Sequence, residues 1–408
     1  MNRTLKIVVL LTALAVAVGL PWFSRSSFTT TLMSQVAIFA VFAVSFNLMW
    51  GGTGMLSFGH ALYFGAGAFT VIHAMRAVND GALTVPIAFL PVLGGFCSLV
   101  LGLVLGAVAT RRSGIAFAMI TMGLGELAYS LSQSLKDTFG GESGISVDRT
   151  QGPEVFGLSF GPHLQAYYVI LVWALACLVL MYGLTRTPLG RIANAVRDNA
   201  ERASFLQFDP YVVRLMMYSA SAFFAGIAGG MSSFLYEITT VEALSLNHSS
   251  NVVLMSVIGG TGNFLGPVIG AGLVTWLQST LSDHSEAWLF YYGVFFVLMI
   301  VYAPSGTAGM FTGLFRILRG PTRYRDLAAI GRRTLGLVPL SLGTVLFIEM
   351  AYRASAVNAR GRLLELPGGI RLDASAMWAW IVPAVLIAAG TWIARRSARP
   401  AQQPEATR

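Results

Sequence analysis

Long apolar runs separated by short polar segments extend along the whole sequence. A run of about 18 or more apolar residues can cross a hydrocarbon core of ~30 Å as a helix. The runs are continuous and carry Gly, Pro and Trp, whereas the strands of a membrane β-barrel would alternate over short segments. The pattern predicts an all-α polytopic membrane protein with about ten core transmembrane helices or half-helices and two more at the C-terminal end. The runs are Ile7–Phe23, Leu32–Trp50, Met55–Met75, Leu83–Ala109, Gly114–Leu135, Ala166–Leu184, Tyr211–Tyr236, Asn251–Leu281, Trp288–Tyr302, Leu335–Tyr352 and Ala376–Ala394.

One run must turn back inside the membrane. The acidic segments around Glu237–His248 and Asp283–Glu286 are both expected outside, yet only Asn251–Leu281 separates them. This run is therefore predicted to enter and return, with its turn in GGTGNFLGP (Gly259–Pro267). Non-helical backbone is tolerated there if protein or a water-filled cavity surrounds it. Because Asn251–Gly259 is too short for a full crossing at ~1.5 Å per residue, the turn is expected near mid-membrane.

The composition agrees with a membrane protein. Hydrophobic residues make up 55% of the 408 residues and charged residues only 11%, and the mean hydropathy is +0.68. These values exclude a soluble globular protein. Cys97 and Cys177 both fall inside apolar runs, so no disulfide framework is predicted. The five histidines lack the spacing of ligands, so no metal site is predicted.

The asymmetry of basic residues sets the expected orientation. Placing Arg111/Arg112, the segment 185–210 and the two C-terminal arginine clusters inside puts most of the 27 basic residues in the cytoplasm, as positive-inside topology requires. Both termini are then cytoplasmic. No small-x-small cleavage site follows the first run, which favours a retained span over a cleaved signal. Because the arginines lie in short loops, no nucleic-acid partner is indicated.

The two lysines exclude one way of binding ATP. A P-loop needs Gly-x-x-x-x-Gly-Lys-Ser/Thr, and neither Lys6 nor Lys136 lies in such a sequence. The runs contain no His/Glu metal pair and no nucleophile–base arrangement of an intramembrane enzyme. The chain is therefore predicted not to be an enzyme and to hold no cofactor of its own.

A polar island, Thr185–Pro210, interrupts the apolar pattern. It carries four arginines and three acids and is prone to form a helix over 190–203, after Pro188 and Gly190. A compact charged helix between two spans suits docking into a groove of a soluble partner. The alternative is a solvated loop whose arginines set the topology. The apolar side consists of Ile192, Ala195, Val196 and Ala203, and the polar side of Arg191, Arg197, Asp198, Asn199, Glu201 and Arg202.

Few polar residues lie within the spans. Glu126 is the sharpest candidate for a functional residue, because a carboxylate in a span is costly; it could line the pathway or instead snorkel outward or pair with a backbone amide. Ser57 and His60 lie among glycines and could bond a polar group of a solute or cap the following helix. Glu349, near the end of a later span, is expected at the membrane interface.

The two halves of the sequence share a weak internal repeat. Gly51-Gly52-Thr53-Gly54 and Gly259-Gly260-Thr261-Gly262 are each followed by a Gly-Ala-Gly sequence. Gly-interrupted segments repeated in two halves are typical of transporters, with the substrate site at their interface. The alternative is close helix packing through small residues.

Four stretches in order resemble one known family. Motifs of branched-chain amino acid ABC transporter permeases are similar to GGTGMLSFGHALYFGAGAF (Gly51–Phe69), FAMITMGLGELAYSL (Phe117–Leu131) with FGGESGI (Phe139–Ile145), GRIANAVRDNAERA (Gly190–Ala203) and VIGGTGNFLGPVIGAGL (Val257–Leu273). The resemblance covers roughly residues 30–309.

The resemblance implies partners, a location and a cargo. Such permeases lie in the bacterial inner membrane among lipids and pair with a second, related permease subunit. Two cytoplasmic ATP-binding subunits drive them, so ATP is bound by partners. A periplasmic solute-binding protein delivers hydrophobic amino acids in most members, and amides, urea or aromatic acids in others. The rival hypothesis is an ion-coupled secondary transporter with Glu126 as the coupling acid, for which the spans hold few acids.

The residues and the resemblance together give the expected site residues. The outer loop Phe139–Pro162 would dock the binding protein, with a merely solvated loop as the alternative. The ATPase-coupling residues are Gly190, Arg191, Val196, Arg197, Asp198, Asn199, Glu201 and Arg202; the translocation residues are Ser57, Gly59, His60, Glu126, Gly259, Gly260, Gly262 and Pro267; and the docking residues are Gly141, Glu142, Ser143 and Gly144.

The chain continues beyond the part that resembles the family. Residues 1–309 form the expected permease core, and 310–333 mix aromatic and aliphatic residues with arginines, as in an amphipathic helix on an anionic leaflet. Residues 334–394 are expected to form a two-helix membrane extension, and 395–408 a disordered cytoplasmic tail. The sequence indicates no function for this addition.

Overall fold

The computed structural model describes residues 12, 15–22, 26–153, 160–284, 287–302, 306–307, 309, 343–354, 363–366, 370–373 and 376–398. The chain forms two compact units. The first comprises Met1–Thr280 and Phe295–Gly309, and the second comprises Leu281–Val294 and Met310–Arg408. The basic segment 310–333 lies outside the described residues.

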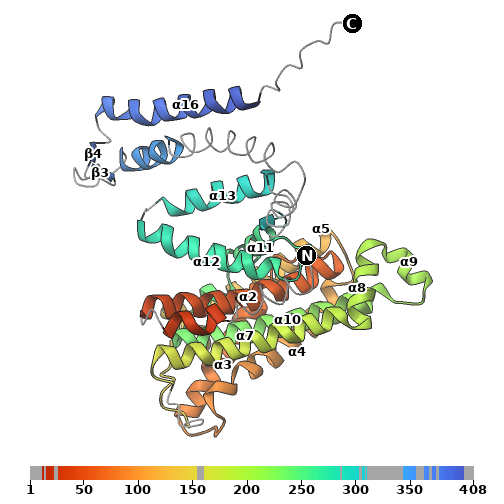
Figure 1. Ribbon diagram of the computed structural model, residues 1–408. Helices are drawn as coiled ribbons and strands as arrows, with labels where there is room; N and C mark the ends of the chain where they lie inside the picture. The colour runs from red at the N-terminus through yellow and green to blue at the C-terminus, as the bar shows by residue number, and fades with distance from the viewer. Residues whose placement is uncertain are drawn as a thin grey trace, which may run out of the picture. The chain divides into compact units, whose positions relative to one another are not determined.

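Six helices among the described residues are long and apolar enough to cross a membrane, which confirms a multi-pass helical membrane protein. They lie side by side in the first unit (Figure 1), where α10 contacts α2, α3 and α4. Within the first predicted run, Ile7–Phe23, residues 15–22 are helical. The hydroxyls of Tyr167 and Tyr168 in α7 donate to the carbonyls of Ala17 and Val18, respectively. The six are α2 (Ser27–Thr53), α3 (Ala61–Asn79), η1 with α4 (Ile87–Phe89, Pro91–Ala109), α5 (Ile115–Ser134), α7 (His163–Arg186) and α10 (Pro210–Tyr236).

Small residues let α10 approach its neighbours closely. A Cβ on Gly67 of α3 would lie 2.2 Å from the Gly226 carbonyl oxygen of α10, and a Cβ on Gly229 would lie 1.8 Å from that of Phe64. A side chain at either position would collide with backbone, so glycine is required by packing. The close contact makes α10 the centre of the bundle.

The chain leaves the helix between α2 and α3, contrary to the predicted run Met55–Met75. Gly54 ends α2 in the left-handed region (φ 74°) and donates its N–H to the Trp50 carbonyl. Residues 54–60, the α2–α3 break, are non-helical. Ser249 Oγ then accepts the N–H of Ala61, the first residue of α3 (2.9 Å). The predicted start of this run, Met55, was therefore too early, since α3 begins at Ala61. Apolar residues continue through the α2–α3 break, and the sequence does not show that Ser249 accepts the first N–H of α3.

The predicted interruption near residues 259–267 is present. Helix α11 (Leu246–Gly259) and helix α12 (Gly266–His284) are separated by residues 260–265. With 14 residues, α11 is about 21 Å long at 1.5 Å per residue, less than a full hydrocarbon core. A Cβ on Gly259 would lie 2.0 Å from the Gly266 carbonyl oxygen, so the two helix ends meet through glycine backbone.

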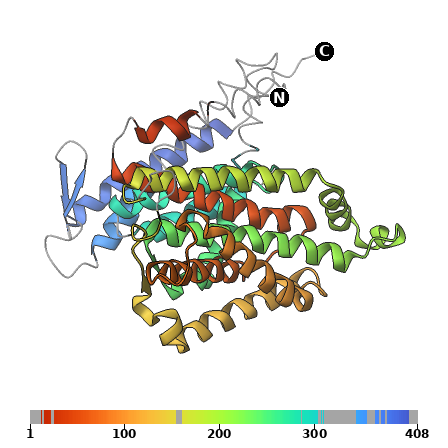
Figure 2. The same ribbon diagram turned by 90° about the horizontal axis from the view of Figure 1, so that it is seen from below.

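Short elements connect the spans at the two ends of the bundle. After α5 come α6 (Lys136–Phe139), η2 (Gly141–Ser143) and β1 (Ile145–Ser146), which pairs antiparallel with β2 (Ile238–Thr239) after α10. The 3-10 turn η3 (Val241–Leu244) leads into α11. At the other end, α8 (Pro188–Asp198) and α9 (Ala200–Phe205) extend past the ends of α7 and α10 in both views (Figures 1 and 2).

The second unit contains helical and strand elements. Residues 343–354 are helical, and a Cβ on Gly343 would lie 2.8 Å from Leu386 Cβ of α16, so these helices cross closely. A hairpin of β3 (Leu363–Leu366) and β4 (Ile370–Asp373) was not predicted, although Pro-Gly-Gly between two alternating segments is a hairpin signal. The remaining elements are α13 (Trp288–Tyr302), which contributes to both units, η5 (Met377–Trp380) and α16 (Ile381–Ala398), which continues four residues past the predicted end of its run.

Candidate functional site

The polar island folds as two helices, not as the single predicted helix over 190–203. Thr187 caps α8 by accepting the N–H of Gly190, and Pro188 occupies its first turn. Asn199 leaves the helix (φ −160°, ψ 101°), and its side chain accepts the N–H of Arg202 to begin α9 (2.8 Å). The prediction failed because an Asn side chain can replace a helical hydrogen bond with a cap.

The apolar residues of this α8–α9 segment (residues 187–209) are only partly available to a partner. Val196 and Ala203 are buried within the chain, at 2% and 3% exposure, and Gly190 packs against the Leu184 and Thr185 backbone. Ala195 is exposed. The polar residues keep the outward positions that the sequence predicts: Arg191, Arg197, Asp198, Asn199, Glu201 and Arg202 are exposed.

Arg197 reaches back from α8 to the end of α2. Its Nη1 donates to the Gly51 carbonyl oxygen. Its Nε and Nη2 both donate to Asp198 Oδ1, at 3.1 Å each. The guanidinium therefore satisfies one of the carbonyls that the last turn of α2 leaves without a helical partner.

The two Gly-Gly-Thr-Gly sequences meet at this end of the bundle. A Cβ on Gly51 would lie 3.2 Å from the Thr261 carbonyl oxygen. The Phe264 ring lies 5.3 Å from that of Tyr182, five residues before Thr187. The α11–α12 turn therefore lies beside the last turns of α7, which corrects the expectation that it lies near mid-membrane. That expectation started the inward helix at Asn251, whereas α11 begins at Leu246.

Other glycines of this turn have different roles. Gly260 has φ 96°, in the region that favours glycine. A Cβ on Gly306 would lie 2.5 Å from Gly260 Cα, so the later segment packs onto the turn through glycine. A Cβ on Gly262 would meet nothing within 4 Å, so space does not require glycine there. Pro267 occupies the first turn of α12, where its missing N–H leaves no helical bond unmade.

Ser57 and His60 are buried in the α2–α3 break. Both are at most 1% exposed. His60 Nε2 lies 3.1 Å from Ser45 Oγ, and its ring stacks on Phe42 at 5.3 Å. Neither side chain caps α3, a role that Ser249 fills. Among the described residues, Ser57 Oγ and His60 Nδ1 have no hydrogen-bond partner, so both retain the capacity to bond a small polar molecule.

Glu126 projects from the exposed side of α5. Near it, a Cβ on Gly59 would lie 1.9 Å from the Thr121 carbonyl oxygen, so the break packs directly on α5. In the described part of the chain Glu126 makes no hydrogen bond or ion pair, and the alternative of pairing with a backbone amide is not observed. It lines a shallow surface depression that is too small to enclose a water molecule. The other lining residues are Phe58, Met122, Gly125, Leu244, Leu246 and Ser249.

The expected docking residues divide into backbone and side-chain roles. Gly141 and Gly144 have positive φ values of 60° and 70°, and a Cβ on Gly144 would lie 2.5 Å from the Thr239 carbonyl oxygen. These glycines are explained by the loop conformation and by β1–β2 pairing. Glu142 and Ser143 are exposed on the surface of the protein.

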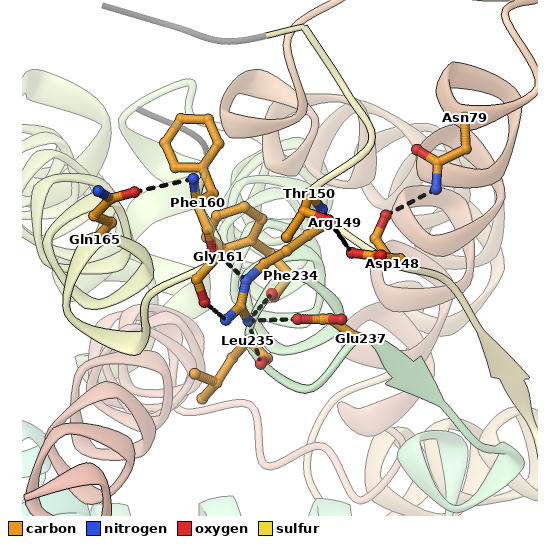
Figure 3. Close-up of polar contacts among 10 residues, drawn as sticks. All are labelled: Asn79, Asp148, Arg149, Thr150, Phe160, Gly161, Gln165, Phe234, Leu235 and Glu237. Atoms are coloured by element: carbon orange, nitrogen blue, oxygen red, sulfur yellow. Dashed lines mark hydrogen bonds and ion pairs between the residues drawn. The ribbon is translucent and has the colours of Figure 1, made fainter. Parts of the chain in front are cut away.

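Arg149 is a structural residue of the same loop that sequence reasoning missed. It is 2% exposed and pairs with Glu237 Oε1 at 3.1 Å. Its Nε donates to the Phe160 carbonyl (2.7 Å) and its Nη1 to the Leu235 carbonyl (2.9 Å), as Figure 3 shows. Arg149 thereby ties the loop to the C-terminal end of α10. Its position among other loop charges gave no sign of burial.

The neighbouring Asp148 organises the turn before this tether. Its Oδ1 accepts the backbone N–H of Thr150 (2.8 Å) and the Thr150 hydroxyl (2.7 Å). These bonds, the backbone one first, hold the pKa of the Asp148 carboxyl below its ordinary value.

The helical spans, the polar break within them and the charged helices at one end define a multi-pass membrane transport protein. The chain belongs to the family described as the branched-chain amino acid transport system / permease component, whose model matches residues 28–303.

Curated relatives agree with this family. The chain is 26% identical over 325 residues to the high-affinity branched-chain amino acid transport system permease protein LivM of Salmonella typhimurium, covering 74% of each chain. It is 26% identical over 338 residues to the LivM protein of Escherichia coli K12, covering 77% of each. It is also 27% identical over 286 residues to the fructose import permease protein FrcC of Rhizobium meliloti, covering 66% of this chain and 74% of the relative. No solved structure shows a significant match.

Proposed function

We propose that the chain is the permease subunit of an ATP-driven importer for branched-chain or other hydrophobic amino acids, or related small solutes such as amides and urea. It works in the bacterial inner membrane with both termini in the cytoplasm. The family match over residues 28–303 and the LivM relatives support this function. The partners are a second permease subunit, two ATP-binding subunits and a periplasmic solute-binding protein.

The α8–α9 segment is the observation on which the mechanism rests. It extends from one end of the bundle, presents a polar surface and is tied to α2 by Arg197. The chain contains no P-loop. Hydrolysis therefore takes place on a partner, which engages this segment on the cytoplasmic side and drives alternating access of the spans.

The α2–α3 break, α5 and the α11–α12 turn form the proposed translocation region. Ser57 and His60 supply buried polar atoms, and Glu126 supplies a carboxylate in the depression beside them. Gly59 permits the contact of the break with α5, while Gly259 and Gly260 permit the close turn. At the opposite end, Glu142 and Ser143 are exposed for contact with the binding protein.

The names of the relatives agree only in part on the class of solute. The LivM relatives are named for branched-chain amino acids, and FrcC for fructose, at similar identity. A shared permease fold thus accommodates solutes of different chemistry. The amino-acid assignment is preferred because the matching family model is described for that transport system.

Reconstitution tests the proposal. The permease, its partner permease and the ATPases are placed in proteoliposomes with the binding protein, and uptake of labelled leucine, isoleucine, valine, an amide and urea is measured. ATP-dependent uptake of a hydrophobic amino acid supports the proposal. Uphill uptake by this chain alone, driven by a proton or sodium gradient, contradicts it and favours the secondary-transporter alternative with Glu126 as the coupling acid.

A further inference from the structure

The last turn of α2 is completed by a residue from another helix. The final carbonyls of a helix have no partner within it. Gly54 N–H satisfies the Trp50 carbonyl (2.9 Å), and the Arg197 guanidinium, 146 positions along the chain, satisfies the Gly51 carbonyl. A cation at a helix C-terminus is also favoured by the helix dipole.

The fit around this guanidinium is close. A Cβ on Gly54 would lie 3.1 Å from Arg197 Cγ, so the glycine leaves the space in which the aliphatic part of the arginine lies. The guanidinium also donates two 3.1 Å bonds to Asp198 Oδ1. Gly51 also adjoins Thr261, which places the end of α2 against the α11–α12 turn as well. Arg197 thus bonds the end of α2, which leads into the α2–α3 break and itself adjoins the α11–α12 turn.

We infer that Arg197 is a positioning residue that caps α2 from α8 and thereby transmits a displacement of α8 to the α2–α3 break. The inference rests on the proposed function, in which an ATPase moves α8. Residues 54–60 follow the cap directly and contain Ser57 and His60, so a shift of the end of α2 shifts these side chains. Arg191, on the same helix, makes no side-chain hydrogen bond or ion pair within the described residues, so this link belongs to Arg197.

The test uses the complete transporter in proteoliposomes with Arg197→Gln, Arg197→Lys and the control Arg112→Gln. Arg112 is exposed in the segment between α4 and α5, and its replacement removes the same charge. Three quantities are measured: ATPase subunits that co-purify, solute taken up per ATP hydrolysed, and hydrogen–deuterium exchange of the amides of residues 52–62. Exchange is also measured on the permease alone.

For Arg197→Gln we expect normal co-purification, faster exchange at residues 52–62 and a fall in uptake per ATP of about tenfold, within the usual range of coupling energies. Arg197→Lys should restore part of the protection from exchange and part of the uptake per ATP. An ammonium can donate to the Gly51 carbonyl but lacks the several fixed N–H donors of a guanidinium. Arg112→Gln should leave all three quantities unchanged.

Unchanged exchange at residues 52–62 in Arg197→Gln overturns the inference, whether or not ATPase binding is lost. Faster exchange with unchanged uptake per ATP overturns the transmitting role as well. If the wild-type transporter shows no ATP-dependent uptake, the proposed function fails. The exchange measurement on the permease alone then still decides whether Arg197 caps α2.

Discussion

At the scale of single residues, buried charge separates structural roles from functional ones. Arg149 is buried, and its guanidinium is bonded to Glu237 and to backbone carbonyls. Glu126 is exposed and makes no hydrogen bond or ion pair within the described residues. A buried cation with a full set of acceptors holds structure together. An unbonded carboxylate on a membrane-spanning helix requires a polar environment, which the translocation pathway of the proposed function would supply.

Arg149→Met should weaken the attachment of the outer loop to α10. The substitution leaves the Leu235 and Phe160 carbonyls and Glu237 without their partner. The free energy of unfolding should fall by at most about 3 kcal/mol, because Glu237 is partly exposed. Thermal unfolding and proteolysis of the loop in detergent measure the effect. Arg76→Gln, which removes an exposed arginine, is the control. An unchanged unfolding temperature in Arg149→Met would show that the buried pair does not stabilise the fold.

Glu126→Gln should lower uptake by about tenfold, the loss of one charged contact at a pathway. It should leave assembly with the ATPases intact, because Glu126 makes no bond within the described chain. Glu126→Asp, which keeps the charge, should retain most of the uptake. Uptake and ATP hydrolysis in proteoliposomes are compared. Full uptake by Glu126→Gln would remove the carboxylate from the pathway.

The turn at Asp148 should respond to acid. The pKa of this carboxyl is lowered in the folded protein, so its stabilising effect is present above its unfolded value and is lost as the pH falls through the lowered one. The difference in unfolding temperature between wild type and Asp148→Ala should therefore shrink as the pH falls from about 6 to about 3. A difference that grows on acidification would contradict the assignment.

At the scale of elements, the sequence was most informative where local pattern decides structure. The long spans follow from continuous apolarity, and the interruption at residues 260–265 follows from a charge argument that needs no knowledge of packing. The separation of α2 from α3 was predicted, but α3 begins at Ala61, six residues after the predicted start at Met55, because the sequence stays apolar through much of the α2–α3 break. The split of α8 from α9 was missed because Asn199 suits both a helix and a cap.

The contacts that build the candidate site are the least predictable part. Arg197 bonds Gly51, and Ser249 caps Ala61, across 146 and 188 positions. No periodicity relates such pairs, since each depends on how the helices pack. Sequence reasoning therefore selected residue types that do adjoin one another, such as Gly51 and Thr261, but not the bonds between them.

Ser249→Ala should destabilise the start of α3. The hydroxyl accepts the first N–H of that helix, and Ser249 is 1% exposed; loss of an N-terminal cap costs about 1 kcal/mol. Faster amide exchange at residues 61–63 and a lower unfolding temperature are expected. Ser250→Ala, next to it and half-buried, is the control. Equal effects of the two substitutions would show that the capping bond is not the cause.

At the scale of the whole molecule, the family match and the compact units divide the chain at different places. The match ends at residue 303, whereas Leu281–Val294 groups with the C-terminal unit. Within that unit, Tyr291 donates to Glu349 Oε2 (3.1 Å), and Glu349 also pairs with Arg353 at 3.1 Å. Glu349, expected at the membrane interface, is 9% exposed and bonded. The helix of residues 343–354 thus contacts the start of α13 through a buried polar group.

Removal of residues 310–408 should therefore affect stability more than transport. The proposed translocation region and the α8–α9 segment lie entirely in the part that matches the family, so ATP-dependent uptake per permease should stay within about twofold of the full chain. The start of α13 loses its bond to Glu349, and the unfolding temperature should fall. Glu349→Gln in the full chain isolates the contribution of this bond. Loss of uptake in truncated protein that inserts and assembles normally would mean that the C-terminal unit acts in transport itself, since neither the pathway nor the coupling helices would have been removed.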